Sequence, residues 1–395
     1  MWNLPDLLRP ASVDSFLEHV RDRQPMQIGA EDPNRFAGLF SWSELETIFA
    51  RGLFNAEDLK LTANGKALEL QSTNWAGPDG ALKPLAMQAL SRMGVSAIVN
   101  NIQRATTPLW DLACDIERRL ADTVTIGAIA SFSSSAALTV HFDPEDLLVI
   151  QIAGTKNWNL LGAPVEGSGL SRKVTPPPAD VARRITMHPG DVLFVPSGQH
   201  HCCDQEGASL HLGVLISRQT GADFFRYIRD EVRADLFFSN PIPHGHGAAA
   251  LDAYETEFKS RLVEIVERAS LEAFLTEQNS RHAAVSGLDL LGRRDIGAPG
   301  AVLCLVTRRP IPLPASGPIT AAGVSIDASP SLVAAIALLN ERGHLEVAEL
   351  MQTLFDRHGE PELREAMLRL VESGLARIEC PVGESRVAPG VPQRD

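Results

Sequence analysis

The chain has 395 residues, which is enough for two or three domains that each bury a core of their own. Hydrophobic residues make up 44% of the chain and charged residues 22%, as is ordinary for a globular protein. The formal net charge of −13 argues against nonspecific attraction to nucleic acid, which requires Lys and Arg to displace counterions. The same charge would favour the encounter with a basic partner.

The cysteine content and the hydropathy of the chain indicate the cellular compartment in which the protein is expected. The five cysteines are odd in number and none forms a CxxC pair, so neither a disulfide framework nor a thiolate zinc site is expected. Met1 to Pro10 lacks the basic start and continuous apolar run of a signal peptide. No stretch approaches the roughly 18 apolar residues that a membrane-spanning helix needs. We therefore predict a cytoplasmic protein without a membrane partner.

Residues 1–120 combine helical and turn signals. Apolar residues recur with helical spacing, and Ser12 or Asp14 and Ser41 or Ser43 are candidate N-caps. The predicted helices cover 12–20, 41–50, 85–93 and 108–120, with a short strand at 97–99.

From about residue 124 the pattern changes to short β-rich runs separated by Gly and Pro. The predicted strands cover 125–132, 137–141, 147–152, 157–161, 191–195 and 209–216. Many short antiparallel strands of this kind are typical of a barrel or jelly roll, which we place at 121–218. Pro176–Pro178 is expected to lie in a surface loop inserted in this β unit.

Helical signals return after residue 220 and continue into a last section with a different pattern. The predicted elements are helices at 224–238 and 251–275, a strand at 301–308, helices at 331–341, 346–357 and 360–373, and a strand at 375–378. Three helices followed by a strand are the outline of a winged-helix domain, and Pro381–Asp395 is expected to be a loose tail. Residues 331–380 contain nine acidic and five basic residues, whereas a DNA reader needs a basic face. Nucleic-acid binding is therefore not expected.

The most informative residues are a His-x-Asp pair, His141 and Asp143, and a distant pair of histidines, His200 and His201. Two residues at positions i and i+2 of an extended segment project to the same side and can bind one ion. Two imidazoles and one carboxylate hold non-haem Fe(II) on one face and leave positions open. The tripeptide alone is common, but a Gly-x-x-His bend in the same β-rich unit strengthens the prediction. Spacing alone does not show whether His200 or His201 is the third metal ligand.

Lys156 extends the prediction from a metal to a co-substrate. Ala153-Gly154 suits a two-residue hairpin turn, which would place Gln151 opposite Lys156 on one face. A lysine there could reach the far carboxylate of a five-carbon diacid chelated to the metal, such as 2-oxoglutarate. A surface lysine flanking a turn is the alternative.

The two segments HFDPEDLLVIQIAGTKNWNLL and MHPGDVLFVPSGQHH together resemble the JmjC-type 2-oxoglutarate oxygenases. Within these the chain most resembles the ribosomal oxygenases, which hydroxylate Arg or His of ribosomal proteins. The resemblance implies that His141, Asp143 and His201 bind Fe(II), and that Lys156 binds 2-oxoglutarate. It also implies that Trp158 belongs to the structural core.

The resemblance implies an α+β fold for the whole chain. It consists of a double-stranded β-helix, the cupin or JmjC jelly roll, with flanking helices, a helical dimerisation region and a C-terminal winged-helix domain. The corresponding ranges are 1–120 for the N-terminal mixed part, 121–218 for the barrel, 219–298 for the dimerisation region and 299–385 for the winged helix. A homodimer is therefore expected.

Three further polar residues are candidates for the site. The segment Ser131-Phe132-Ser133 resembles one that faces the active site in bacterial Arg hydroxylases, so we assign Ser131 to the substrate and Ser133 to the co-substrate. His211 stands where the family often has a polar residue, and it is either a co-substrate contact or a satisfied core histidine. Ser134 to Val140 departs from the family's Gly- or Asn-rich stretch, which puts the substrate in doubt.

The leading hypothesis is an Fe(II)-, 2-oxoglutarate- and O2-dependent oxygenase that hydroxylates a side chain of a basic protein or peptide; the resemblance implies Arg or His of a ribosomal protein. One alternative keeps this chemistry on a biosynthetic peptide, a small molecule or a tRNA base. Another is a catalytically silent scaffold or regulator.

Overall fold

The computed structural model describes residues 2–55, 57–63, 66–68, 77, 83–133, 138–167, 180–283, 285–290 and 295–380. The internal contacts of the chain divide it into two compact units, Met1–Gln219 and Thr220–Asp395. The loop expected at Pro176–Pro178, the tail from Pro381 and part of the segment from Ser134 to Val140 lie outside the described residues.

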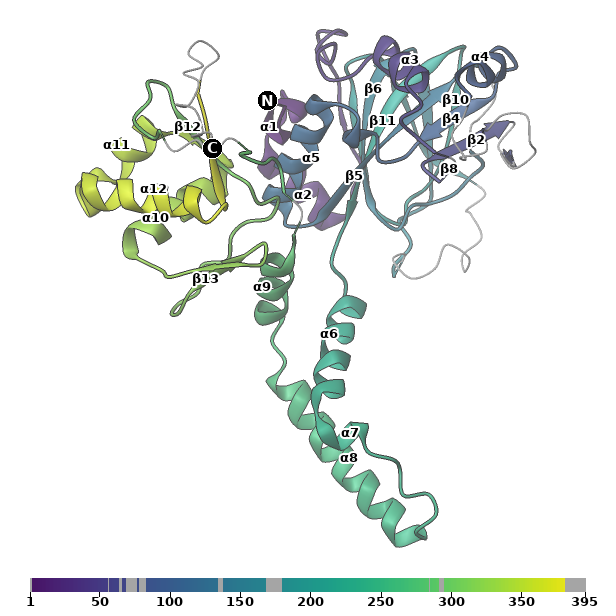
Figure 1. Cartoon of the computed structure of the whole chain (residues 1–395). Helices are drawn as coiled ribbons and strands as arrows, with labels where there is room; N and C mark the ends of the chain where they lie inside the picture. Colours follow the sequence, from purple (N-terminus) through teal and green to yellow (C-terminus); the bar gives the residue numbers. More distant parts are fainter. Residues whose placement is uncertain are drawn as a thin grey trace, which may run out of the picture. The chain divides into compact units, whose positions relative to one another are not determined.

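The first unit contains the elements that carry the candidate site (Figure 1). Its helices are α1 (Leu4–Leu8), α2 (Val13–Asp22), α3 (Trp42–Ala50), α4 (Pro84–Arg92) and α5 (Thr107–Leu120), with a 3-10 turn η1 (Ile102–Arg104). Its strands are β1 (Met26–Ile28), β2 (Leu59–Ala63), β3 (Lys66–Ala67), β4 (Ser96–Val99), β5 (Thr123–Ser131), β6 (Asp146–Ala153), β7 (Lys156–Leu161), β8 (Val181–Met187), β9 (Val192–Val195), β10 (His200–Gln205) and β11 (Ser209–Ser217).

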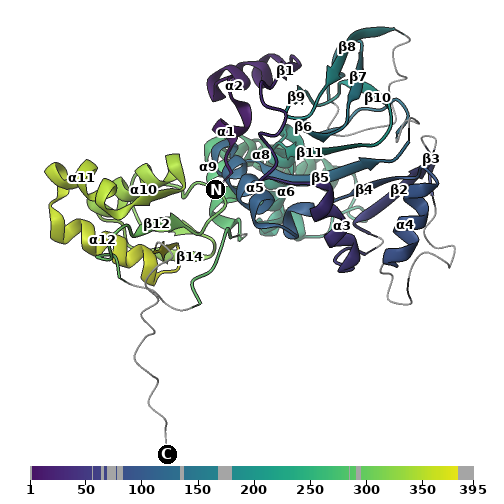
Figure 2. The ribbon, with the colours of Figure 1, turned by 90° about the horizontal axis from the view of Figure 1, so that it is seen from above.

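Two antiparallel sheets face each other in this unit. The larger has the strand order β1-β9-β6-β11-β5-β4-β2-β3, and the smaller has the order β10-β7-β8. One face of the large sheet packs with the helices in the main hydrophobic core, whereas its other face packs against the small sheet in a second core (Figure 2). The jelly-roll prediction is thereby confirmed.

The alternation of side chains along β11 shows how the sequence builds both cores. Leu210, Leu212 and Val214 belong to the helix-side core, whereas Leu215 packs against the core between the sheets. Because successive residues of a strand point to opposite faces, His211 shares the inner face with Leu215. The interior between the sheets is therefore apolar at one end and polar at the other.

Two of the predicted helix starts are confirmed in atomic detail. The Ser12 hydroxyl accepts a hydrogen bond from the Ser15 amide at the start of α2. The Ser41 hydroxyl accepts one from the Glu44 amide at the start of α3. Each bond satisfies an amide that the first turn of a helix leaves without an intrahelical partner.

The predicted pairing of Gln151 with Lys156 is wrong. Strands β6 and β7 do not form a hairpin, because the chain crosses from the large sheet to the small one between them. Gln151 pairs with His211 of β11, and Lys156 pairs with Gln205 of β10. The turn at Gly154 was identified correctly, but local turn chemistry does not specify which sheet receives the next strand.

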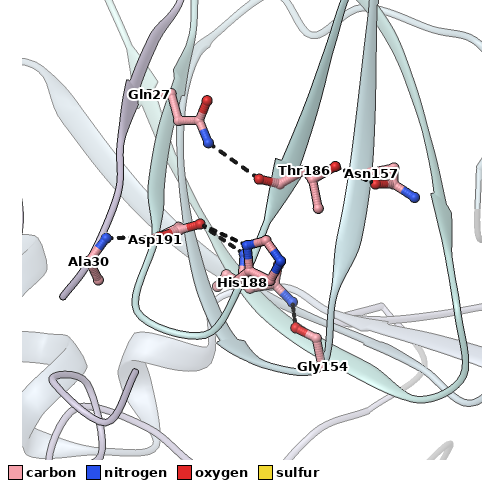
Figure 3. A network of polar contacts seen from close by, with 8 residues as sticks. Gln27, Ala30, Gly154, Asn157, Thr186, His188 and Asp191 are labelled. Carbon is pink, nitrogen blue, oxygen red and sulfur yellow. Dashed lines mark hydrogen bonds and ion pairs between the residues drawn. The ribbon is translucent and has the colours of Figure 1, made fainter. Parts of the chain in front are cut away.

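A network of backbone and side-chain hydrogen bonds holds the end of the barrel at which β6 ends and β9 begins (Figure 3). The Asp191 carboxylate accepts from the amide of Ala30 at 2.9 Å and from the amide of His188 at 2.8 Å. The Gln151 amide donates to the Asp191 carbonyl, and its side-chain amide donates to the Gly154 carbonyl at 2.9 Å. The β8–β9 turn, the end of β6 and the segment after β1 are thus tied together.

Gly154 is required by both conformation and space. Its φ is +70°, and a Cβ there would lie 2.2 Å from the Ala208 carbonyl oxygen. We expect Gly154→Ala to lower the free energy of unfolding by roughly 2 to 5 kcal/mol, from left-handed strain plus the clash. Gly52 is a matched control, since it has φ +63° with nothing within 4 Å of a Cβ. Gly52→Ala should cost only about 1 to 2 kcal/mol in urea unfolding; equal losses at the two positions would contradict the packing argument.

Strand prediction succeeded for β5, β7 and β11, which carry Ser131, Lys156 and His211, but failed for β10, which carries His201. Strands β1, β8 and β10 were not predicted, because they are short or lack a run of strongly β-forming residues. The strand expected at 137–141 is wrong for its described part, where residues 138–141 contribute only an isolated bridge between His141 and His201. For the missed strands and for the wrongly predicted one, segments far away in the sequence determine whether a strand forms.

The second unit contains a helical part and a smaller α+β part. Its helices are α6 (Gly221–Ala234), α7 (Leu236–Ser239), α8 (Ala248–Arg268), α9 (Leu271–Arg281), α10 (Pro330–Arg342), α11 (Val347–His358) and α12 (Glu360–Glu372). Its strands are β12 (Val302–Leu305), β13 (Ile319–Ala321), β14 (Val324–Ile326), β15 (His344–Glu346) and β16 (Ala376–Glu379). Strands β15-β12-β16 form a sheet that shares a core with α10, α11 and α12, and β13-β14 form a hairpin.

The two long helices predicted after residue 220 are each interrupted. Asp235 ends α6, and its carboxylate accepts from the Phe237 amide to start α7. Ser270 caps α9 in the same way by accepting from the Ala273 amide. Among the described residues of the whole chain, none of the helices combines the length and apolar character needed to cross a membrane.

Candidate metal centre and its cation pocket

His141, Asp143 and His201 meet in the polar part of the interior. One ligand atom from each lies within 4.8 Å of the others, and the group is the one set of His, Cys, Asp and Glu with this geometry among the described residues. Nε2 of His201 is 3.7 Å from an oxygen of Asp143, and the two imidazole centroids are 4.4 Å apart. The structure therefore brings together the three residues named from the sequence.

Backbone pairing explains why these residues meet. His141 and His201 form an isolated antiparallel bridge, in which each amide donates to the other's carbonyl at 3.1 and 2.7 Å. The Gly198 amide donates to the Asp143 carbonyl at 2.8 Å. The segment with the first two residues is therefore attached directly to the segment with the third.

The second nitrogen of each imidazole has a backbone partner. Nδ1 of His141 is 2.8 Å from the Thr139 carbonyl, and Nδ1 of His201 is 2.9 Å from the Gln199 carbonyl. Since a carbonyl only accepts, each Nδ1 carries the proton and each Nε2 carries a lone pair. Metal-ligating histidines are oriented in this way, so the donor set fits a divalent ion.

The charge state of His201 also suits a ligand. Burial, followed by the proximity of His141, lowers the pKa of His201 to about 4. The imidazole is therefore neutral at pH 7, as a metal ligand must be. His200, the rival residue, lies outside this cluster, with its ring edge-on to Phe142 at a centroid distance of 5.0 Å.

Lys156 lies deeper in the same interior and is only 2% exposed. Its Nζ is 3.4 Å from the Ser131 hydroxyl and 3.3 Å from Nδ1 of His211. No carboxylate of the described residues lies within ion-pair distance of it, and burial lowers its pKa. A buried ammonium without a counter-charge is costly to the protein.

His211 is placed beside Lys156 and is only 4% exposed. Burial and then the charge of Lys156 lower its pKa well below the usual value, so the ring is neutral. Its Nδ1 can accept from the ammonium, which leaves the proton on Nε2. The contact with Lys156 fits both predicted roles of His211, a co-substrate contact and a satisfied core histidine.

Trp158 and Cys203 lie midway along β7 and β10, between the level of His201 and the level of Lys156. The two residues pair directly across β7 and β10. The indole ring lies 5.3 Å from the His201 ring and 5.7 Å from the His211 ring, measured between centroids, and it is also part of the inner core. Burial raises the pKa of Cys203 to about 12, so it remains a neutral thiol here.

Ser133 does not contact Lys156. Its hydroxyl donates to the Gly94 carbonyl at 3.1 Å, and its carbonyl accepts from the Gln205 side chain at 2.7 Å. The assignment of Ser133 to the co-substrate, and of Ser131 to the substrate, stays a prediction. The contact between Ser131 and Lys156 places Ser131 in the cation pocket itself.

Two further buried polar residues lie on the same inner face: Ser209, which sequence reasoning missed, and Gln151, which it named with the wrong pairing partner. Ser209 pairs with Ser131 across β11 and β5, and its hydroxyl has no hydrogen-bond partner among the described residues. The side-chain oxygen of Gln151, opposite His211, is also without one. The alternation of β11 could have identified Ser209, since it lies two residues before His211 and shares its face.

Comparison with known proteins places these observations in a family context. Residues 98–224 match the JmjC domain family. Ribosomal oxygenase 2 of Rattus norvegicus is 24% identical over 242 residues, which cover 58% of this chain and 50% of that protein. Ribosomal oxygenase 1 of Bos taurus is 25% identical over 237 residues, which cover 56% of this chain and 34% of that protein. The matched region thus spans half or less of these relatives.

Solved structures of the Escherichia coli ribosomal oxygenase YcfD share the fold. One superimposes with a TM-score of 0.57 and 18% identity, and covers 93% of this chain and 98% of that one. Another, of YcfD in complex with cobalt and 2-oxoglutarate, has a TM-score of 0.56 and covers 94% of this chain. The likeness extends over both units of the present fold.

Proposed function

We propose, on the premise that residues 98–224 of this chain are a JmjC domain, that the protein is an Fe(II)- and 2-oxoglutarate-dependent oxygenase. The observation that carries the proposal is a facial cluster of two imidazoles and one carboxylate above a buried, uncompensated lysine. The first suits Fe(II), and the second suits the far carboxylate of a diacid.

His141, Asp143 and His201 would hold the metal on one face, with Nε2 of each histidine as the donor atom. A bound Fe(II) would activate O2, which is the oxidant: one oxygen atom would enter the C–H bond as a hydroxyl group, and the other would go to 2-oxoglutarate as it is converted to succinate and CO2. The residues of the chain orient and protect this chemistry. The Thr139 and Gln199 carbonyls keep the imidazoles in the required tautomer, and Trp158 limits the space beside His201.

Lys156 would bind the far carboxylate of 2-oxoglutarate by a charge-assisted hydrogen bond. Ser131 and His211 keep its ammonium in place, since both lie within hydrogen-bond distance of Nζ. The neutral state of His211 matters here, because a second cation would repel Lys156.

The proposed substrate is a side chain of a ribosomal protein, Arg or His, in a basic protein segment. Support comes from the ribosomal oxygenases among the relatives and from the net charge of −13. A helical dimerisation region, a winged-helix module after residue 299, a homodimer and a cytoplasmic location complete this proposal.

The function is tested with purified full-length protein, Fe(II), ascorbate, 2-oxoglutarate and ribosomal proteins of the source organism. We expect succinate to form and one ribosomal protein to gain the mass of one oxygen atom. Intact-mass comparison of ribosomes from cells with and without this gene should show the same difference. Succinate formation without any modified ribosomal protein would retain the chemistry and reject the substrate.

A further inference from the structure

The bend that precedes His201 is attached to other segments by the backbone polar groups of Ser197 and Gly198. The Ser197 amide donates to a carboxylate oxygen of Asp146 at 2.8 Å, and the Ser197 carbonyl accepts from the guanidinium of Arg23 at 2.9 Å. The Gly198 amide donates to the Asp143 carbonyl at 2.8 Å, and the Gly198 carbonyl accepts from the Val165 amide at 3.0 Å. Two charged side chains from distant elements are therefore among the four partners.

We propose that Arg23 and Asp146 form a clamp that positions the metal ligands Asp143 and His201. The inference rests on the proposed function and adds two positioning residues to it, neither of which touches the metal.

Asp146 acts from the start of β6 and is only 4% exposed. One of its oxygens holds the Ser197 amide, and the other lies 3.5 Å from the guanidinium of Arg218. A buried carboxylate that accepts from an amide makes a short, strong, directional bond. Asp146 follows the ligand Asp143 by three residues. The short segment that contains both therefore includes one metal ligand and also binds the bend that precedes the other ligand, His201.

Arg23 acts from the C-terminal end of α2, far away in the sequence. It has a left-handed φ of 52°, and one guanidinium nitrogen donates to both the Val165 and Ser197 carbonyls at 2.9 Å. It thereby joins the segment after β7 to the bend before β10. Gly198, with φ +79°, allows the bend to turn between these two anchors.

The clamp reaches the ligand through Gln199. The side-chain amide of Gln199 donates to the carbonyls of Leu161 at 2.9 Å and Gly162 at 3.2 Å, and the backbone carbonyl of Gln199 accepts from Nδ1 of His201. If the bend moves, the carbonyl that sets the His201 tautomer moves with it. Loss of outer partners of this kind typically weakens metal binding about 10- to 100-fold.

The test is titration of metal-free, full-length protein with Co(II), followed by visible absorption. Asp146→Ala should weaken Co(II) binding about 10-fold or more and change the band shape at saturation, because the ligand geometry relaxes. Asp146→Asn should restore most of the affinity, since its side-chain oxygen can still accept from Ser197. Arg23→Met, which keeps the apolar stem, should also weaken binding about 10-fold. This variant carries the test if Asp146→Ala does not fold.

Asp204→Ala is the matched control for general loss of stability. Asp204 is on the same strand as His201, but its carboxylate accepts from Asn157, Asn159 and Arg184, away from the bend. This variant should unfold at lower urea concentration and bind Co(II) as the wild type does. Unchanged Co(II) affinity in folded Asp146→Ala and Arg23→Met would overturn the clamp alone. Failure of the wild-type chain to bind Co(II) would overturn the proposed function, and the clamp with it.

Discussion

Replacement of His201 with alanine should abolish 2-oxoglutarate turnover, whereas replacement of the adjacent His200 should leave most of it. His201 contributes one of the three donor atoms that lie within 4.8 Å of one another, and His200 contributes none. Loss of a ligand should weaken Co(II) binding by more than the roughly 100-fold upper effect of losing an outer partner. The measurements are succinate formation with Fe(II) and the same Co(II) titration.

The two variants control for each other, because both histidines are buried on one strand. His201 is 3% exposed and His200 is 2% exposed, so an alanine leaves a similar cavity at either position. A similar loss of stability is therefore expected, with very different metal affinities. Metal binding that survives in His201→Ala but fails in His200→Ala would reverse the assignment.

Replacement of Lys156 with methionine should raise the 2-oxoglutarate concentration for half-maximal turnover by roughly 10- to 150-fold. This range corresponds to the approximately 1.5 to 3 kcal/mol that a hydrogen bond to a charged group contributes. Methionine keeps an unbranched, apolar stem of similar length, so the pocket should retain its packing. A variant with an unchanged co-substrate requirement would show that Lys156 does not bind the diacid.

The same substitution should stabilise the protein in the absence of co-substrate. Burial depresses the pKa of Lys156 from 10.5, so the folded protein binds fewer protons than the unfolded chain between the two pKa values. The resulting penalty is complete below the folded pKa and disappears as the pH rises to 10.5. At pH 7 we expect Lys156→Met to raise the free energy of unfolding by on the order of 1 kcal/mol, because residues retained for function are often not the most stabilising choice at their position. The gain should shrink toward pH 10 in urea unfolding; a loss of stability at pH 7 would contradict an uncompensated buried lysine.

The prediction of the fold was most accurate where the signal is local. Helix caps at Ser12 and Ser41 and the alternation of β11 depend on residues within a few positions of one another. The strands β8 and β10 were missed because neither has a continuous run of strong β-formers, and their pairing with β7 stabilises them. The interruption at Asp235 was missed for another reason, since helical periodicity continues through it while the aspartate caps the next helix.

For the candidate site, the residue types of the ligands and of Lys156 could be read from the sequence. Spacing left His200 and His201 equivalent, and the strand alternation of β10 separates them by placing only His201 toward His141. The predicted route to Lys156, a hairpin opposite Gln151, was wrong, although Lys156 does lie in the interior. Its actual neighbours, Ser131 and His211, come from strands of the other sheet.

The sequence by itself determined the chemistry that this protein can hold, because donor types and their near spacing are local properties. It supplied two imidazoles, a carboxylate and a lysine within one β-rich interval. Only the tertiary structure decided which of these groups meet, which tautomer they adopt and what anchors them. Those outcomes depend on hydrogen bonds between segments far apart in the chain, such as Arg23 with the Ser197 carbonyl, which no local pattern encodes.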